Sequence, residues 1–193
     1  MIRVLLVDDH PALRAGLSAV LRSEPGIVPL GTAGSAAELW PALNRTHPDL
    51  VLLDYHLPPD DGLALCRRIR RLIPAPAVLM YSAYAGAQLV LPARLAGAAG
   101  LVHKSAPANE LYDAIRTVAA GGSVLPPLPR ELLQQAGERV EPEDLPILGM
   151  VLDDTPPTDI AQVLGLTRGA LDARLDAMVG RLRVEVAAAV GAG

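Results

Sequence analysis

Two aspartates stand where an apolar run near the start of the chain ends. Residues 3–11 read RVLLVDDHP, which places Asp8 and Asp9 directly after the apolar stretch VLLV. The segment LVLLD repeats this pattern and ends in Asp54. Three carboxylates held together repel one another, so such a group is stable only with a cation between them. Mg²⁺ prefers oxygen ligands of this kind, and an Asp carboxylate can also accept a phosphoryl group as a nucleophile.

A hydroxyl residue and a lysine accompany two later apolar runs. Ser82 ends the run at 77–82, and Lys104 follows the run at 101–103. Lys104 is the only lysine in the chain, which argues against a purely solubilising role. A metal ion and a lysine together neutralise the oxygens of a transferring phosphoryl group. The order of these features favours a phosphoryl-transfer pocket over the simpler alternative, in which the aspartates only start loops or cap helices.

Apolar runs that indicate strands alternate with amphipathic helical segments in the first part of the chain. This alternation predicts an α/β fold with a doubly wound, five-stranded parallel sheet. Ligands bind beyond the carboxyl ends of the strands in such sheets, so the three aspartates and Ser82 should face one crevice. The strands are expected at 2–7, 27–33, 50–54, 77–82 and 101–103. The helices are expected at 11–21, from Ser35 onward, at 61–72 and at 107–120.

The composition changes after residue 122, which predicts a first domain at 1–122. Residues 123–140 are predicted to form a linker with one helical turn near residues 130–135, because prolines are dense in this region. The pattern that follows is helical and predicts a second, smaller all-α domain at 141–193. Its helices are expected at 143–152, 158–164, 168–182 and 184–190.

Bulk composition excludes several classes of protein. The chain has 193 residues, of which 51 % are hydrophobic, so it can bury the cores of one or two domains. Cys66 is the only cysteine, which excludes a disulfide framework and a Cys-rich metal site. Aspartates appear by residue 9, which argues against a secretory signal. No apolar run approaches the ~18 residues of a membrane span, so we expect a cytoplasmic protein that does not contact a membrane.

Residues 1–122 resemble the receiver domain of bacterial two-component response regulators. The resemblance is carried by VDDHPALRAGL, LLDYHLPPDDG, YSA and GAAGLVHK, and it spans the whole domain. It implies a flavodoxin-like fold in which Asp54 is the phosphoacceptor and a sensor histidine kinase donates the phosphoryl group. It also implies that Ser82 turns toward the phosphoryl group and that Lys104 pairs with the phosphoryl oxygens.

The same resemblance implies Mg²⁺ as the cofactor. Asp8, Asp9 and Asp54 are implied as its side-chain ligands, and the backbone carbonyl of His56 is implied as a further ligand. The histidine rings, that of His10 included, lack the spacing of a zinc site. We therefore expect none of these rings to hold a metal.

Two residues depart from the receiver pattern. Receivers usually carry Tyr or Phe three residues before the lysine, and that position is Leu101 in this chain. Pro92 falls inside the expected fourth helix, where it removes a backbone donor. We therefore expect the phosphorylation chemistry to follow the family and the transmission step to differ from it.

The second domain resembles the helix-turn-helix output domain of LuxR/NarL-type regulators. The resemblance is carried by EPEDLPILGMVLDD and by TDIAQVLGLTRGALDARLDAMVGRLRV, and its apolar framework fits better than its contact residues. It implies a recognition helix, starting near Arg168, that lies in the major groove of DNA. The arginines that could contact DNA are Arg168, Arg174 and Arg181.

The charge of this domain is unusual for a DNA-binding protein. Residues 141–193 contain four Arg and no Lys against nine Asp and Glu, a net charge of −5. Basic residues that neutralise phosphates supply much of the affinity for DNA. The family typically places Val-Lys early in the recognition helix, where this chain has Leu171 and Asp172.

Three hypotheses of function follow from these features. The leading one is a transcription regulator that is switched by phosphorylation of Asp54, forms a homodimer when phosphorylated and binds DNA. The alternative keeps the switch but lets the acidic output domain bind a protein partner. The third, an aspartyl phosphatase, is disfavoured because such enzymes typically carry Asp-x-Asp at the end of the first strand, whereas His10 occupies the third position here. We therefore expect a phosphoacceptor and not an enzyme.

Overall fold

The computed structural model describes the backbone of residues 1–190 and the side chains of residues 1–183. The chain forms two compact units, which are treated separately below. The first unit comprises residues 1–85 and 97–126, and the second comprises residues 86–96 together with the chain from residue 127 onward. No helix in the described part of the chain has the length and apolar character needed to cross a membrane.

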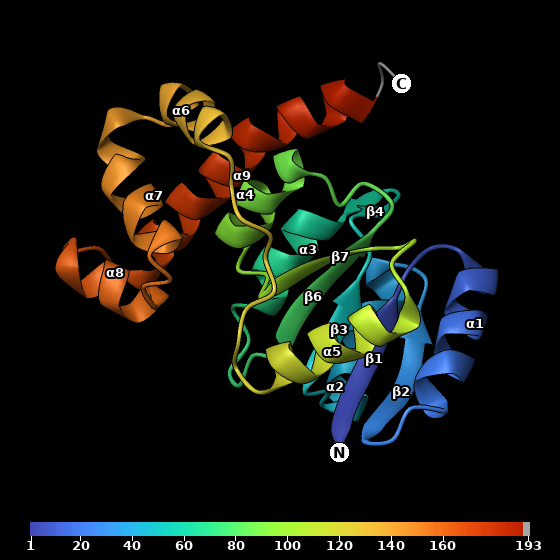
Figure 1. The fold of residues 1–193 in the computed structure, drawn as a ribbon. Coiled ribbons are helices and arrows are strands. Elements are labelled where there is room, and N and C mark those ends of the chain that lie inside the picture. Colours follow the sequence, from blue (N-terminus) through green and yellow to red (C-terminus); the bar gives the residue numbers. More distant parts are fainter. Residues whose placement is uncertain (191–193) are drawn as a thin grey trace. The chain divides into compact units, whose positions relative to one another are not determined.

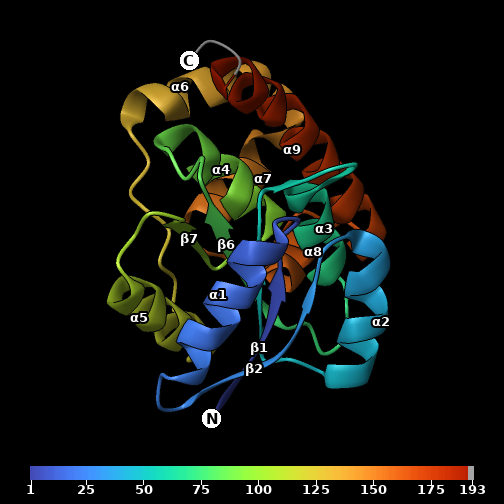
Figure 2. The same ribbon diagram turned by 90° about the vertical axis from the view of Figure 1, so that its right-hand side faces the viewer.

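The first unit is a five-stranded parallel sheet with helices on both faces, as the alternating pattern predicts (Figure 1). The strand order is β2-β1-β3-β6-β7. Helices α1 and α5 cover one face, and α2 and α3 cover the other (Figure 2). The strands are β1 (Ile2–Val7), β2 (Ile27–Ala33), β3 (Leu50–Leu53), β6 (Ala77–Ser82) and β7 (Gly100–His103). The helices are α1 (Pro11–Arg22), α2 (Ala36–Thr46), α3 (Gly62–Ile69) and α5 (Ala108–Ala119).

The core of this unit is aliphatic, since the chain has no Phe. The central strands β1 and β3 are buried on both faces, which explains why they appear in the sequence as continuous apolar runs. One face packs against α1 and α5 through a cluster that includes Leu6, Leu21 and Ile115. Burying each such side chain contributes about 1.5–3 kcal/mol. The packed core therefore holds the strand ends in fixed positions.

Local signals in the sequence set the helix starts. Ser35 caps α2, as expected: its Oγ accepts from the amide of Glu38, and Glu38 Oε2 accepts from the amide of Gly34. The helix expected at 61–72 runs from Gly62 to Ile69 in the structure; Asp61 caps its start from an extended conformation and accepts from the amide of Leu63 at 2.8 Å. A short antiparallel ribbon precedes it and was not expected from the sequence. Its strands are β4 (His56–Leu57) and β5 (Asp60–Asp61).

The thiol of Cys66 is buried on α3, where the side chain forms part of the core. Burial raises the pKa of Cys66 to about 12. Because the thiolate is the reactive form, we expect Cys66 of the native protein to resist alkylation at pH 8 and to react fully in denaturant. Mass spectrometry of iodoacetamide-treated protein measures this directly. Rapid labelling of the native chain would show that α3 opens readily.

The second unit is helical, as predicted, but three of its helices differ from the expected ones. The single turn expected at 130–135 is a helix of ten residues. The helix expected at 143–152 is divided into η1 and α7, and the segments expected at 168–182 and 184–190 form one continuous helix, α9. The elements are α4 (Ala87–Ala96), α6 (Arg130–Arg139), η1 (Pro142–Asp144), α7 (Leu145–Leu152), α8 (Pro157–Val163) and α9 (Arg168–Val190).

Helix α4 is the unexpected member of this unit. It packs against α9 and α7 (Figure 1) although it lies in the sequence between β6 and β7. Arg94 Nη1 donates to the carbonyl of Leu152 at 3.0 Å and lies 2.9 Å from Asp154 Oδ1. Pro92 stands within α4, as the sequence predicts. The domain boundaries 1–122, 123–140 and 141–193 stay a prediction. The contacts additionally show that α4 groups with the C-terminal helices.

Candidate functional site: an acidic pocket at the carboxyl edge of the sheet

Three charged residues follow the carboxyl ends of strands β1, β3 and β7, and backbone hydrogen bonds fix each of them. The amide of Asp8 donates to the carbonyl of Ala33 at 3.1 Å, and that of Asp54 donates to Val7 at 2.8 Å. The amide of Lys104 donates to Ser82 at 2.9 Å. The sheet pairing thus continues by one residue beyond β1, β3 and β7. Positions far apart in the sequence are thereby brought to one edge.

The Lys104 ammonium lies between two carboxylates of this pocket. Its Nζ is 2.5 Å from Asp8 Oδ2 and 2.6 Å from Asp54 Oδ2. The Asp54 side chain is only 3 % exposed, and that of Lys104 is 15 % exposed. The other oxygen of Asp54, Oδ1, accepts from the amide of His56 at 3.2 Å. Both oxygens of the predicted phosphoacceptor therefore have a donor.

The electrostatics of the pair follow from burial and charge. Burial raises the pKa of Asp54 above its ordinary value of 3.8, and the nearby Asp8 carboxylate adds to this rise, while Lys104 opposes it. Burial alone would lower the pKa of Lys104, but its contacts with Asp54 and Asp8 outweigh this effect and raise it. Lys104 is therefore charged at neutral pH and offsets the repulsion between the two carboxylates.

The imidazole of His10 lies beside the carboxylates of Asp8 and Asp9. The sequence analysis expected no histidine ring to hold a metal, so this position of His10 was not predicted. His10 Nδ1 is 2.7 Å from Asp9 Oδ1 and 3.2 Å from Asp8 Oδ1. Its amide also donates to Asp8 Oδ1 at 2.7 Å. One ligand atom from each of Asp8, Asp9, His10 and Asp54 can be chosen so that all lie within 4.8 Å of one another. Asp8, Asp9 and His10 are consecutive in the sequence, and this adjacency could have predicted the contact.

The donor set of this pocket fits a divalent cation. Among the described residues, Asp8 Oδ2 and Asp9 Oδ1 are buried without a hydrogen-bond partner, although each lies at ion-pair distance from a nitrogen. Unshared oxygen lone pairs at a partly desolvated site are what a hard cation binds. Three carboxylates also match the preference of Mg²⁺ for oxygen ligands. The roles of Asp8, Asp9, Asp54 and the His56 carbonyl as ligands stay predictions.

Ser82 is fully buried at the carboxyl end of β6. Its Oγ accepts from the amide of Tyr84 at 3.0 Å, so the hydroxyl is held by its own loop. The neighbouring Tyr81, which the sequence analysis did not single out, donates from its hydroxyl to the carbonyl of Lys104 at 3.1 Å. Leu101, at the family's usual aromatic position, is buried in β7. An aromatic side chain of β6, Tyr81, thus contacts the backbone of Lys104.

The arginines predicted to contact DNA all engage carboxylates of the second unit. Arg168 Nε lies 3.7 Å from Asp172 Oδ2, and Arg174 Nε lies 3.4 Å from Asp144 Oδ1. Arg181 Nη2 lies 3.0 Å from Glu141 Oε1. Leu171, which the resemblance aligned with a contact position, is fully buried. These positive charges are therefore partly neutralised within the unit, and their role in DNA binding stays a prediction.

Comparisons with known proteins agree with this architecture and this pocket. A family model described as response regulator receiver domain matches residues 4–116. The transcriptional regulatory protein MctR of Rhizobium johnstonii is 32 % identical over 171 residues, which are 86 % of this chain and 80 % of MctR. The chain therefore belongs to the two-component response regulators.

Within this class, the chain is of the LuxR/NarL type. It is similar to a two-component response regulator of the LuxR family from Aurantimonas sp. SI85-9A1, with 35 % identity and a TM-score of 0.62 over 73 % of this chain and 99 % of that chain. It is also 38 % identical to the DNA-binding transcriptional activator DevR/DosR of Mycobacterium tuberculosis over 125 residues, which are 65 % of this chain and 58 % of DevR/DosR. These findings confirm the predicted family and fold class.

Proposed function

We propose that this protein is a regulator of transcription that is switched by phosphorylation. A sensor histidine kinase supplies the phosphoryl group, Asp54 accepts it, and the helical second unit then dimerises and acts on DNA. The observation that carries the proposal is the buried contact between Asp54 and Lys104, 2.6 Å, at the carboxyl edge of the sheet. This edge is where ligands of open α/β sheets bind.

The chain's own residues account for the transfer step. A carboxylate oxygen of Asp54 attacks phosphorus as the bond between phosphorus and the kinase's histidine nitrogen breaks. Asp8, Asp9 and Asp54 would hold Mg²⁺, which would supply positive charge near the phosphoryl oxygens. Lys104, which keeps its proton, supplies a second positive charge. The product is an acyl phosphate on the protein itself, so repeated turnover of a phosphate ester would contradict this assignment.

Chain connectivity offers a path from the pocket to the second unit. Ser82 ends β6 and Lys104 follows β7, and the segment between these strands contains α4. Helix α4 packs against α9 and α7 within the second unit. Rearrangement of Ser82 toward a phosphoryl group displaces the loop that leads into α4, and it thereby biases the packing of α9.

DNA selection tests the output directly. The full chain is incubated with genomic fragments at two salt concentrations, with and without a stable mimic of aspartyl phosphate. We expect enrichment of a dyad motif that becomes stronger with the mimic, since a symmetric dimer reads two half-sites. If no DNA fragment is retained at either salt concentration while the mimic is bound to Asp54, DNA is rejected as the target.

Protein binding is a second candidate output, and the ion pairs of α9 favour it. Arg174 and Arg181 both lie within 4.0 Å of Asp144, whose side chain is only 6 % exposed. Residues 141–193 have a net charge of −5, which disfavours contact with phosphates. An acidic helical surface suits a basic face of another protein.

Substitution of the arginines separates the two outputs. If α9 contacts phosphates, Arg168→Ala should weaken binding about tenfold and reduce the slope of log affinity against log salt by about 1. Arg116→Ala, on α5 of the first unit, is the matched control and should leave both quantities unchanged. Equal DNA affinity of Arg168→Ala and the unsubstituted protein would favour the protein-binding output.

A further inference from the structure

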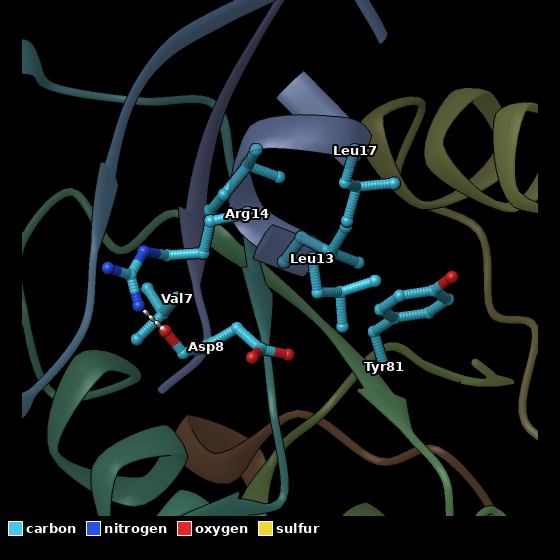
Figure 3. A pocket seen from close by; sticks show the side chains of 8 residues that line it. Val7, Asp8, Leu13, Arg14, Leu17 and Tyr81 are labelled. Atoms are coloured by element: carbon cyan, nitrogen blue, oxygen red, sulfur yellow. Dashed lines mark hydrogen bonds between the residues drawn. The ribbon is translucent and has the colours of Figure 1, made fainter. Parts of the chain in front are cut away.

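The main-chain carbonyl of Asp8 is held by an arginine to which the resemblance assigns no role. Arg14 Nη1 donates to the carbonyl oxygen of Asp8 at 2.5 Å, and Figure 3 shows its side chain reaching from α1 to the end of β1. The amide of Asp8 still pairs with Ala33 of β2. Its carbonyl lies beyond the last paired residue of β1, and a charged donor replaces the missing strand partner there.

The guanidinium fits in this place because residue 34 is a glycine. A Cβ at Gly34 would lie 2.9 Å from Arg14 Nη1 and 3.2 Å from both Cζ and Nη2 of the same side chain. These three atoms are its nearest neighbours. The φ angle of Gly34 is not in the left-handed region, so backbone conformation does not require glycine here. The space at Gly34 is occupied by the flexible end of the Arg14 side chain, so an added Cβ would displace the guanidinium.

We propose that Arg14 is a positioning residue of the metal pocket and that Gly34 is its necessary complement. The bond to the carbonyl fixes the peptide plane between Asp8 and Asp9, and it therefore sets the direction of both carboxylates. Asp8 is then fixed at three atoms: its amide by Ala33, its carbonyl by Arg14 and its Oδ1 by the His10 amide, while its Oδ2 lies 2.5 Å from the Lys104 ammonium. Groups that orient metal ligands in this way typically contribute 10–100-fold to metal affinity.

The placement of Arg14 supports this role. Its side chain is half-buried and extends toward Val7 and Asp8, while Leu13, Leu17 and Tyr81 line the other side of the same hollow of about 10 Å³ (Figure 3). An arginine that only solvated α1 would not donate to the end of β1. The inference rests on the proposed use of Mg²⁺ by the pocket.

Calorimetric titration of the full chain with MgCl2 tests the proposal. We expect Arg14→Ala to weaken Mg²⁺ binding about tenfold and Arg14→Lys, which keeps a charged donor, to remain within about threefold of the unsubstituted protein. Gly34→Ala should weaken binding by at least about threefold, because it displaces the guanidinium. In the Arg14→Ala background, the same Gly34→Ala change should have no further effect, since the two residues act as one unit.

Two controls separate a structural defect from a positioning effect. Arg22→Ala, also on α1, and Gly16→Ala, whose added Cβ would have no neighbour within 4 Å, should both leave Mg²⁺ affinity unchanged. Normal binding by Arg14→Ala, or an equal effect of Gly34→Ala in both backgrounds, would overturn the positioning role. If Arg14→Ala does not fold, Gly34→Ala against Gly16→Ala decides the same question. Failure of the unsubstituted chain to bind Mg²⁺ would instead overturn the proposed function of the pocket.

Discussion

Asp54→Asn will take up no phosphoryl group from a small acyl-phosphate donor, whereas the unsubstituted chain gains the mass of one phosphoryl group. The amide cannot act as the nucleophile, and Asp54 is the carboxylate that contacts Lys104 at 2.6 Å in the interior of the pocket. Intact-protein mass spectrometry in the presence of Mg²⁺ measures the uptake. Asp113→Asn is the matched control, because its side chain is 76 % exposed on α5, and it should be phosphorylated normally.

The same Asp54→Asn substitution should raise the thermal midpoint of unfolding at neutral pH in buffer without Mg²⁺. The pKa of Asp54 is raised in the folded chain, so ionisation of this side chain destabilises the native state above its ordinary pKa of 3.8. The stabilisation by Asn should therefore be complete above the raised pKa of the folded chain, and it should shrink as the pH falls from that pKa toward 3.8. In the phosphorylation experiment described above, normal uptake of a phosphoryl group by Asp54→Asn would show that another residue is the phosphoacceptor.

Lys104→Met should cause the largest loss of stability of any single substitution in the pocket. It keeps the length of the side chain but leaves Asp8 and Asp54 without the ammonium that lies within 2.6 Å of both. Removing one partner of a buried ionic group leaves uncompensated charge, and we expect a loss of about 2 kcal/mol in the free energy of unfolding. Because Mg²⁺ can supply the missing positive charge, its addition should stabilise Lys104→Met more than it stabilises the unsubstituted chain.

Chemical denaturation at neutral pH, with and without Mg²⁺, provides the measurement. The control is Arg116→Met, which removes an exposed cation that pairs with Asp113 and Glu24 and should change stability by less than about 0.5 kcal/mol. The pKa of Lys104 is raised in the folded state, so its contribution is complete at neutral pH and is lost as the pH rises through that folded value. Equal stability of Lys104→Met and the unsubstituted chain without Mg²⁺ would show that the carboxylates do not depend on the lysine.

Much of the first unit is predictable from the sequence because its strands are buried on both faces. Continuous apolar runs such as Val4–Val7 have few alternatives to a central parallel strand. A polar side chain directly after such a run then lies at the carboxyl edge by necessity. This logic placed Asp8 and Asp54 at one edge without any knowledge of distances, and the structure shows Lys104 in contact with both.

The features that escaped prediction depend on contacts between distant positions. Nothing local in residues 87–96 distinguishes a helix that packs on the sheet from one that packs on α9, yet α4 groups with the second unit. The contact between Arg14 and Gly34 likewise joins a helix to the end of a different strand. Helix α6 was expected to be a single turn because its flanks are rich in proline, but Pro129 directly precedes it, where a missing N–H disrupts no helical bond.

The acidic charge of residues 141–193 is the feature that the family resemblance explains least. Asp144 is buried and contacts both Arg174 and Arg181, so part of this charge stabilises the packing of α9 against η1. A stabilising role for the arginines and a DNA-contacting role compete for the same side chains. The effect of Arg168→Ala on DNA binding therefore carries more weight than the net charge in deciding between the two outputs.

Hydrogen exchange of the intact chain with and without beryllofluoride, a stable mimic of the aspartyl phosphate, tests the central claim most directly. The account predicts that exchange rates change in the pocket and also in α4 and α9, because α4 connects the strands that carry Ser82 and Lys104 to the helices of the second unit. The same treatment of Asp54→Asn should change neither helix. Changes confined to residues 1–85 and 97–126, with α4 and α9 unaffected, would contradict a switch that acts through this helix.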